Sequence, residues 1–541
     1  MSQVPDARSP CLIGVGRRTW HPSDVGVDGA PEPLDMWEEV VRLAAQDAGS
    51  ASPNRVLTSV ERLHLVYCQS WEYDDPAGRL ADRLGAHRAS GRYSGIGGSV
   101  PQTLLSEAAV GILAGDLDLA VVVGGEALAT LRMLKKQGRK PQWSHRAAER
   151  RPFPFDIPFH PAEVAHSIFE AYVTFSMFDS AHRAHLGRDL DEHRRRLGHL
   201  MAPLSGVAAG DPAHAWFPIR RDPAELSTPS ADNRMVAYPY TKLMMAIMDV
   251  DMASAVIMAS HSQADALGVP TEKRVYLRGW GYAQDPNYVA ERRDLWRSPA
   301  MAVAGRSALA GAGIQVDDVA YLDLYSCFPA SLSFAADAIG LDPEGDASGA
   351  RPLTVTGGLP YHGGPGSNYM THSIAAMATK LRADPGTYGL TSGVGMHMTK
   401  HAFGLWSSEP GPVALPDDAQ TARELAIEAE RSAHPDPVHG PDRASASGSV
   451  AGTGEVSGGP VGRVPIVASA EGPGVVAAYT VIHDRQGAPS WAPLVCSLPD
   501  GTRCYARIDD LDTLASAEED ELIGRTVHLS SEDGGVNRAH L

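Results

Sequence analysis

Cysteine is scarce in this sequence, and the few cysteines that occur are scattered. The chain of 541 residues has five of them, at positions 11, 68, 327, 496 and 504, and no two form a C-x-x-C pair. This low density excludes a disulfide-stapled scaffold, and the spacing lacks the paired ligands of a structural zinc site. Thiols of this kind fit a reducing compartment, so we expect a cytoplasmic protein with no metal.

Two further absences narrow the classes of function. Basic residues are in deficit, with 47 Lys and Arg against 65 Asp and Glu, and the net charge of −18 opposes attraction to nucleic acid. No uncharged apolar run reaches the length of a membrane span, and the start MSQVPDARSPCLIGVG lacks the basic and apolar regions of a signal peptide. We therefore predict a soluble protein with neither a nucleic-acid nor a membrane partner.

Large apolar residues are almost absent from residues 433–462, which are rich in Pro, Gly, Ser and Ala. Such a stretch buries too little surface to offset its ordering entropy, so we predict a linker over residues 416–462. Residues 463–541 then form a C-terminal module. Its short runs VVAAYTVIHD, APLVCSL, RCYARID and GRTVHLS, separated by Gly, Pro and Asp, favour an all-β barrel of the OB type, with a β-sandwich as the alternative.

An approximate duplication organises the residues before the linker. In the first half, a strand candidate, a helix entered through glycines and a buried strand follow one another as ERLHLVYCQS, GGSVPQTLLSEAAVGILAGDL and DLAVVVGGEAL. The second half repeats this order with VAYLDLYSCF, SNYMTHSIAAMATKLRA and TYGLTSGVGM. Residues 129–240, richer in charge, Pro and aromatics, interrupt the rhythm and indicate an inserted subdomain. The rhythm resumes at DVDMASAVIMAS.

At these segments the sequence resembles the thiolase superfamily over roughly its first 415 residues. The opening CLIGVGRRTW is similar to the first strand of that family, and AGDLDLAVVVGGEAL resembles its Gly-Asp, buried strand, Gly-Gly-x-Glu segment. The resemblance implies an α/β protein with the duplicated five-layer αβαβα fold. Its N-terminal half would span 10–128 and 241–268 around a loop domain at 129–240, and its C-terminal half 269–415. The added OB-like module is most similar to the mycobacterial thiolase-like proteins of type one.

The residues that carry catalysis in thiolases are replaced at the matching positions. Counting back from Gly115-Asp116, the reactive cysteine should fall near Gly98, which Ser99 follows. In GGLPYHGGPGSNYM, Gly364 stands where the family has its histidine, and His362 lies two residues earlier. The segment of the second catalytic cysteine reads Ser392, Gly393, Val394, Gly395. A thiolate is the group that attacks a thioester well, so ordinary thiolase turnover is not expected.

Gly98 and Gly364, the glycines at the entrances of the two predicted central helices, can be interpreted in two ways. Their backbone N–H groups could still face a thioester carbonyl, as at other helix N-termini, or they could persist only because the central helices pack tightly.

Three other residues are candidates for chemistry at the same cleft. In Tyr325-Ser326-Cys327-Phe328, which resembles the family segment Asn-Glu-Ala-Phe or His-Asp-Cys-Phe, the Tyr325 phenol could supply a donor to an oxyanion hole. Cys327 keeps family-like chemistry, although burial as a small apolar residue is the alternative. Tyr361 could act as a second acid or base, whereas packing is the ordinary role of such tyrosines.

A basic cluster and a pair of histidines are further candidates for ligand or metal contacts. The basic cluster Lys135, Lys136, Arg139 and Lys140 lies in the segment that covers CoA in the family, so it is a candidate contact for the nucleotide phosphates, with a solvated charge run as the alternative. His397 and His401 stand four residues apart, as two ligands on one helical face would, but no third ligand is evident.

The resemblance implies a protein of lipid metabolism that binds CoA or an acyl-CoA, with weak or no Claisen condensation. An acetyl-CoA acetyltransferase-like acyltransferase is the corresponding enzyme class. The first alternative is a retro-aldolase that cleaves a β-hydroxyacyl-CoA with tyrosine as acid and base. The second is a scaffold without catalysis that recruits a protein partner through its OB-like module. A monomer and a dimer both remain open.

Overall fold

The computed structural model describes residues 6–149, 159–342, 351–412, 463–532 and 535–541. Its largest element is a nine-stranded sheet with the order β3-β2-β4-β7-β1-β8-β11-β10-β9. The strands are β1 Pro10–Thr19, β2 Arg62–Leu65, β3 Ser90–Tyr93, β4 Leu119–Ala127, β7 Asp251–Ser260, β8 Val275–Gln284, β9 Val319–Asp323, β10 Tyr388–Gly395 and β11 Lys400–Ser407. The predicted linker lies outside the described residues.

The nine strands form two half-sheets with the same internal order. β2-β4-β7-β1 of the first half correspond to β9-β10-β11-β8 of the second. The halves meet where β1 pairs with β8, through Cys11 opposite Tyr276 and Leu12 opposite Val275. β4 and β7 are buried along their whole length, which explains why they read as continuous apolar runs.

Two central helices lie between the half-sheets. α5 (Val100–Ala114) and α16 (Tyr369–Ala383) touch each other, and each also contacts strands of both halves. Both are rich in small residues and buried on most sides, as expected of a helix enclosed by two sheets. They are the helices that the glycine-entered segments predicted.

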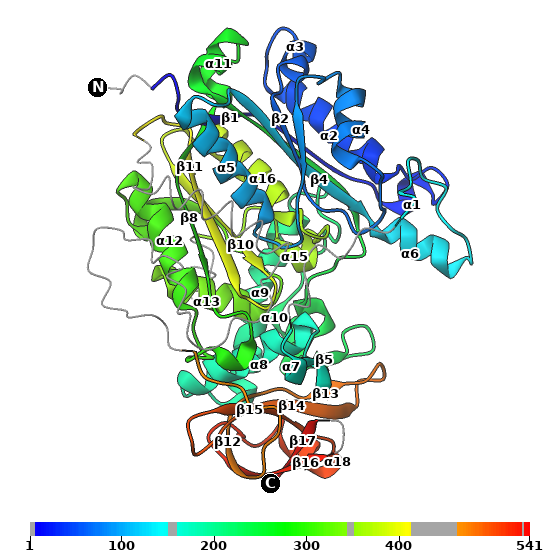
Figure 1. Cartoon of the computed structure of the whole chain (residues 1–541), viewed down its shortest axis with the longest axis vertical. Helices are drawn as coiled ribbons and strands as arrows, with labels where there is room; N and C mark the ends of the chain where they lie inside the picture. The colour runs from blue at the N-terminus through cyan, green and yellow to red at the C-terminus, as the bar shows by residue number, and fades with distance from the viewer. Residues whose placement is uncertain (1–5, 150–158, 343–350, 413–462, 533–534) are drawn as a thin grey trace.

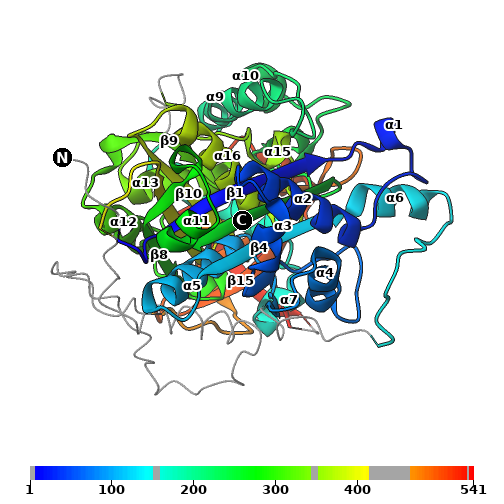
Figure 2. The ribbon, with the colours of Figure 1, turned by 90° about the horizontal axis from the view of Figure 1, so that it is seen from above.

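The outer helices complete five layers. α2 (Pro33–Asp47) packs on β1, β4 and β7, and α12 (Pro299–Ala312) packs on β8 and β11. Figure 2 shows α2 and α12 on opposite sides of the molecule. Further elements of these outer layers and their connections are α1 Pro22–Val25, α3 Pro53–Thr58, α4 Pro76–Leu84, α11 His261–Ala266, η2 Thr271–Lys273, η3 Val289–Glu291, η4 Val316–Asp318, α13 Pro329–Ile339 and α15 Gly358–Tyr361. The predicted αβαβα fold is confirmed.

In each half, a pair of glycines lies where the outer helix packs on its strand, so this contact is duplicated as well. A Cβ atom on Gly14 or Gly16 of β1 would lie 2.0 or 2.1 Å from a carbonyl oxygen of α2, at Ala44 or Val40. On β8, a Cβ on Gly279 or Gly281 would lie 2.1 or 2.0 Å from a carbonyl oxygen of α12. Each outer helix therefore approaches its strand at a distance that only glycine permits.

The inserted segment connects β4 to β7 and is mostly helical. Its elements are α6 Leu128–Lys136, α7 Pro161–Ala165, α8 Ala171–His185, α9 Leu190–Ala209, α10 Pro223–Ser227, β5 Met235–Ala237, β6 Tyr240–Thr241 and η1 Lys242–Met244. Figure 1 places α7, α8 and β5 between the layered core and the C-terminal domain. No helix among the described residues is both long and apolar enough to cross a membrane.

The C-terminal domain is a closed five-stranded barrel, as the OB-type prediction requires. Its strand order is β12-β16-β17-β15-β14, and a pairing of β12 with β14 closes the ring. The elements are β12 Gly472–Tyr479, β13 Ile482–His483, β14 Pro489–Ser497, β15 Arg503–Ile508, α18 Leu511–Ser516, β16 Thr526–Glu532 and β17 Val536–His540. β13 also pairs with β5, Ile482 opposite Ala237, so the sheet continues into the inserted segment.

His64 of β2 gives the fold a specific sensitivity to acid. Its ring is fully buried, and neither nitrogen has a hydrogen-bond partner among the described residues. Burial lowers its pKa to about 3, and the charges of Arg92 and Arg62 act in the same direction. The unfolded chain takes up a proton near pH 6.5, so unfolding becomes easier by about 1.4 kcal/mol per pH unit below that value until the folded pKa is reached.

We expect His64→Leu to remove this contribution. Between about pH 7.5 and about pH 5.5 the free energy of unfolding should fall by roughly 1.4 kcal/mol less in the variant than in the parent chain. Urea unfolding followed by tryptophan fluorescence measures the difference. His87→Leu is the control, because the His87 side chain is 72% exposed. Equal pH dependence in the parent and the His64 variant would contradict this account.

Candidate functional site

Two segments, one from each half, meet at the entrance of α5. Gly98 and Ser99 immediately precede this helix, and Gly393 and Gly395 form the end of β10. A Cβ atom on Gly393 would lie 2.9 Å from the Gly98 carbonyl oxygen, and one on Gly395 would lie 3.2 Å from Ser99 Oγ. The structure thus brings together the segments predicted to match the two thiolase cysteine positions.

The phenol of Tyr325 occupies the space beside Gly98. A Cβ atom on Gly98 would lie 2.2 Å from the Tyr325 hydroxyl oxygen and 2.4 Å from the Val394 carbonyl oxygen. Real Cβ atoms do not approach other atoms so closely, so position 98 has no room for a side chain. Where the family resemblance leads us to expect a cysteine, the chain therefore presents a tyrosine from its second half.

Tyr325 is held firmly between β9 and α13. Its backbone N–H donates to Ser392 Oγ at 2.9 Å, and its ring meets the Tyr369 ring edge-on at 5.6 Å between centroids. Burial raises the pKa of the phenol, and the neighbouring Cys327 raises it further. The phenol therefore stays protonated at neutral pH and can donate a hydrogen bond, but it is a poor base.

Cys327 lies close to Tyr325, and its thiol is protonated. Burial raises the pKa of this thiol to about 12. Its Sγ atom lies 3.6 Å from Ser331 Oγ, and Ser331 donates to the Tyr325 carbonyl at 2.7 Å. A thiol in this state is a weak nucleophile.

Gly364 and His362 are occupied by contacts within the chain. The Gly364 N–H donates to the Ile247 carbonyl at 2.8 Å. His362 Nε2 lies 3.3 Å from Nδ1 of His372, and burial, followed by the charge of Arg17, lowers the pKa of His362 to about 3. A neutral, enclosed imidazole in this place does not substitute for the family histidine.

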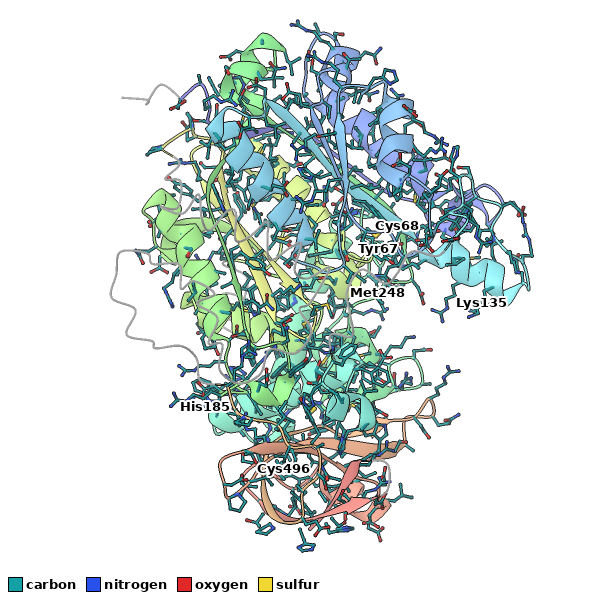
Figure 3. All side chains as sticks on the ribbon, in the orientation of Figure 1. Tyr67, Cys68, Lys135, His185, Met248 and Cys496 are labelled. Carbon is teal, nitrogen blue, oxygen red and sulfur yellow. The ribbon has the colours of Figure 1, made fainter. Side chains whose placement is uncertain are left out.

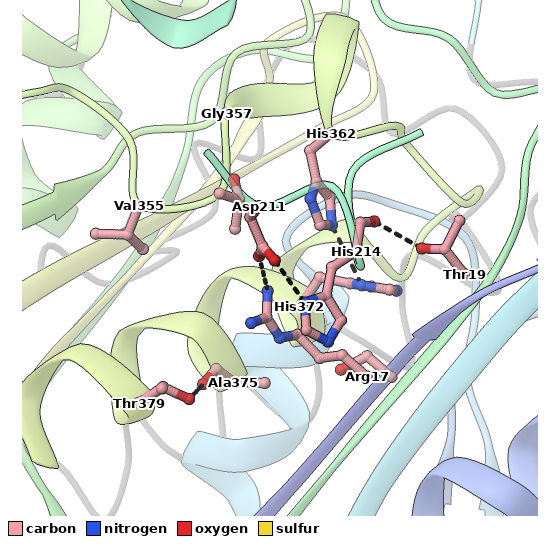
Figure 4. Close-up of polar contacts among 12 residues, drawn as sticks. Arg17, Thr19, Asp211, His214, Val355, Gly357, His362, His372, Ala375 and Thr379 are labelled. Atoms are coloured by element: carbon pink, nitrogen blue, oxygen red, sulfur yellow. Dashed lines mark hydrogen bonds and ion pairs between the residues drawn. The ribbon is translucent and has the colours of Figure 1, made fainter. Parts of the chain in front are cut away.

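The surroundings of His362 form a polar cluster that sequence reasoning missed. Figure 4 shows Arg17 of β1 together with Asp211 and His214 of the inserted segment, next to His362 and His372. His214 Nδ1 lies 2.8 Å from Asp211 Oδ1, and Arg17 lies 3.5 Å from the other carboxylate oxygen. Within this cluster, Arg17 lies on an apolar strand, where a cation is unusual. That cation was the signal in the sequence that could have indicated the cluster.

Tyr361 faces the inserted segment. Its hydroxyl is buried, has no hydrogen-bond partner within the described ranges, and lies in the field of Arg221 and Glu225. Its carbonyl accepts from the Phe217 N–H at 2.8 Å. Burial raises the pKa of this phenol too, but the structure does not bring it together with Tyr325.

The basic cluster lies at the surface, at and beyond the end of α6. Lys135, Lys136, Arg139 and Lys140 are all exposed, and Arg139 is paired with Asp28. Figure 3 places Lys135 at the outer edge of the molecule. Among the described residues the three lysines form no ion pair, whereas part of the Arg139 charge is already compensated.

His397 and His401 do not share a face. They belong to the hairpin between β10 and β11, where His397 Nδ1 lies 2.7 Å from Thr174 Oγ1 and His401 Nε2 lies 3.0 Å from Asp285 Oδ2. Within the described residues no group of three or more His, Cys, Asp or Glu side chains could hold a metal ion.

A recess lies elsewhere, between the inserted segment and the barrel. Its cavity volume of about 10 Å³ leaves room for about one water molecule, and it is lined by Asp179, Ser180, Arg183, Leu190, His193, Tyr238, Pro239, Tyr479 and Thr480. None of the Tyr325 group lines it. The recess is thus a feature of the domain boundary, and the chemistry-bearing residues around Gly98 are a separate site.

Comparisons with known proteins agree with this architecture. Residues 281–401 match the model "Thiolase C-terminal domain-like", and residues 455–534 match "Thiolase-like protein type 1 additional C-terminal domain". A crystal structure described as a monomeric SCP2-thiolase like protein type 1 from Mycobacterium smegmatis is similar over 99% of this chain and 100% of its own, with 28% identity and a TM-score of 0.78. No curated protein sequence matches the chain.

More distant structures share the layered part. An Ltp2-ChsH2(DUF35) aldolase has 16% identity and a TM-score of 0.55, over 74% of this chain and 98% of its own. An acetyl-CoA acetyltransferase from Syntrophomonas wolfei has 15% identity and a TM-score of 0.51, over 74% of this chain and 99% of its own. At these identities the likeness concerns the fold.

The duplicated layers and the matched domain define a thiolase fold. The chain belongs to the thiolase superfamily, and it carries the additional C-terminal domain found in type 1 thiolase-like proteins.

We expect Gly98→Ala to lower the free energy of unfolding by about 1–3 kcal/mol, because the new methyl group would overlap the Tyr325 hydroxyl and the Val394 carbonyl. Chemical denaturation measures the loss. Gly206→Ala in α9 is the matched control. The three atoms nearest to its Cβ would belong to the Arg220 guanidinium, the closest at 3.4 Å, so the better helix propensity of alanine should raise stability by up to about 1 kcal/mol. An unchanged stability in Gly98→Ala would show that Tyr325 does not fill this position in solution.

Proposed function

We propose that this protein binds CoA or an acyl-CoA on a thiolase scaffold without forming the acyl-enzyme of ordinary thiolases. The observation that carries the proposal is the Tyr325 hydroxyl, which stands beside Gly98 in place of a nucleophilic thiol. The nearby Cys327 thiol is protonated, so covalent capture of an acyl group is not available to it at neutral pH. Five free, buried cysteines also support the proposed cytoplasmic location.

The site offers a neutral hydrogen-bond donor for a thioester. A protonated phenol can donate to the thioester carbonyl oxygen, and it stabilises that oxygen as charge develops on it. In this proposal the acyl end lies near Tyr325 and the ends of α5 and β10. The nucleotide end lies toward the inserted segment, where Lys135, Lys136 and Lys140 are exposed.

We expect saturable binding of acetyl-CoA or a longer acyl-CoA in isothermal titration calorimetry. Intact mass spectrometry after incubation should show no covalent acyl adduct. Replacing Lys135, Lys136 and Lys140 by Ala should weaken binding by about two- to fivefold per lysine that contacts a phosphate. Lys273→Ala is the control, because Lys273 is paired with Asp47 on another face. Absence of heat with CoA and with every acyl-CoA tested would reject the proposal.

The placement of Tyr325 also favours a second candidate, cleavage of a β-hydroxyacyl-CoA. In this reaction the β-hydroxyl gives its proton to solvent and the bond between the α and β carbons breaks. Its electron pair forms the enolate of the shortened acyl-CoA, and a carbonyl compound leaves. The enolate then takes a proton at its α carbon. Tyr325, being protonated, suits the donor role, and neither step needs a thiolate.

If this activity exists, Tyr325→Phe should reduce its turnover by about a hundredfold or more, since a positioned acid contributes that much. Tyr361→Phe tests the second predicted tyrosine. Tyr321→Phe is the control, because that hydroxyl is bonded to Asp384 at the exposed edge of β9. Release of the carbonyl product, followed by chromatography, is the measurement. Full turnover in Tyr325→Phe would remove this residue from the mechanism.

A further inference from the structure

Hydrogen bonds connect the barrel to a short segment of the core, and further contacts connect this segment to the candidate site. This segment, residues 289–293, comprises η3 and the two arginines after it. The Arg503 guanidinium of β15 donates to the Arg292 carbonyl at 2.5 Å and to the Arg293 carbonyl at 3.1 Å. The Tyr505 hydroxyl, also on β15, accepts from the Ala290 N–H at 2.8 Å. Figure 1 shows β15 on the side of the barrel that faces α7 and α8.

The buried carboxylate of Glu163 adds hydrogen bonds to both the barrel and this segment. Glu163 of α7 accepts from the Tyr505 hydroxyl at 2.5 Å and from the Val289 N–H at 2.9 Å. Glu163 is 2% exposed, so these bonds form away from water, where each is stronger than at the surface. The barrel, the inserted segment and residues 289–293 are thereby joined in one hydrogen-bonded network.

The Arg292 side chain connects this segment to the turn between β10 and β11. It is 3% exposed, its guanidinium lies 4.4 Å from the Phe178 ring centroid, and its Nη2 donates to the His397 carbonyl at 2.5 Å. His397 stands two residues after Gly395, in the turn between β10 and β11. Arg503 of the barrel and the turn beside the site are thus separated by one residue, Arg292.

The turn that Arg292 holds is conformationally strained. Met396 and Met398, on either side of His397, have φ angles of 55° and 52°, in the left-handed region that side-chain-bearing residues rarely adopt. Such conformations cost of the order of 1–3 kcal/mol each and persist where surrounding contacts enforce them. The Arg292 bond to the carbonyl between them is such a contact.

The position of this turn determines the geometry of the site. β10 ends at Gly395, and the Val394 carbonyl lies against Gly98, beside the Tyr325 hydroxyl. A shift of the turn would move that carbonyl and alter the space around the phenol.

We propose that the C-terminal barrel is a positioning element of the candidate site. Arg503 and Tyr505 fix residues 289–293, Arg292 holds the strained turn at residues 396–398, and the turn sets the end of β10 against Gly98 and Tyr325. The consequence for ligand affinity rests on the proposed function, whereas the mechanical coupling does not.

Hydrogen exchange on the full-length chain tests the coupling without any ligand. In Arg503→Met, we expect backbone amides in residues 394–400 to exchange about tenfold faster, because the loss of these bonds frees Arg292. Arg507→Met is the matched control on the same strand, since the partners of Arg507, Asp509 and the Trp491 ring, both belong to the C-terminal domain. It should leave residues 394–400 unchanged.

Three further variants make the test decisive. Arg292→Met should reproduce the faster exchange, and adding Arg503→Met to it should produce little more, as expected for residues on one path. Arg503→Lys should restore part of the protection, because an ammonium group can still donate to the carbonyls. Tyr505→Phe removes a single hydroxyl, and it replaces Arg503→Met as the test if that variant does not fold.

The outcomes separate the two proposals. Faster exchange at residues 394–400 in the Arg503 or Tyr505 variant, but not in Arg507→Met, supports the positioning role even if no CoA binding is detected. Unchanged exchange, or an equal rise in the control, overturns it. If acyl-CoA does bind, its dissociation constant should rise in Arg503→Met and stay constant in Arg507→Met.

Discussion

Helices α5 and α16 lie against each other between the two half-sheets, and this enclosure constrains the rest of the structure. Each helix must approach strands of both halves, so the residues before it meet backbone at very short range. Asn368, just before α16, donates to the Gly124 carbonyl of β4 at 2.7 Å, and a Cβ on Gly124 would lie 2.7 Å from the Asn368 amide oxygen. Gly366 approaches Glu126 in the same way, with 2.5 Å between a hypothetical Cβ and the carboxylate. The Gly124-Gly125-Glu126 segment of the first half is therefore shaped by the second half.

The same enclosure decides what chemistry the site can perform. Gly98 leaves a space at the entrance of α5, and the Tyr325 phenol fills it. The pKa values of Tyr325 and Cys327 are both raised by burial, so both side chains remain neutral at physiological pH. A site with neutral donors and no thiolate can polarise a carbonyl oxygen, but it does not attack a thioester. In the proposed function, the residues that depart from the thiolase pattern replace a nucleophile by a hydrogen-bond donor.

The C-terminal barrel is integrated with the core rather than attached only by its connecting chain. Strand pairing between β13 and β5, the Tyr505 and Arg503 contacts, and the bond that the Tyr479 N–H donates to Ser180 Oγ join it to the inserted segment and to the second half. The small recess lies along this boundary. Removing the barrel would expose the buried Glu163 and release residues 289–293, so the domain and the candidate site form one mechanical unit.

The sequence alone determined the duplicated strand, helix, strand order, the insertion after β4 and the OB-type barrel, because these depend on local periodicity, turn residues and composition that each segment carries by itself. The arrangement in five layers followed from the resemblance to the thiolases. The same resemblance also predicted that Gly98, Gly364 and the segment from Ser392 to Gly395 stand where that family has reactive residues. Only the tertiary structure decided that Tyr325 fills the space at Gly98, that Tyr361 faces the inserted segment, and that His397 and His401 have separate partners. The cluster of Arg17, Asp211 and His362, and the path from Arg503 to His397, were equally hidden. Each joins residues far apart in the chain, and their proximity arises from how the two half-sheets, the insertion and the barrel pack, which no local pattern encodes.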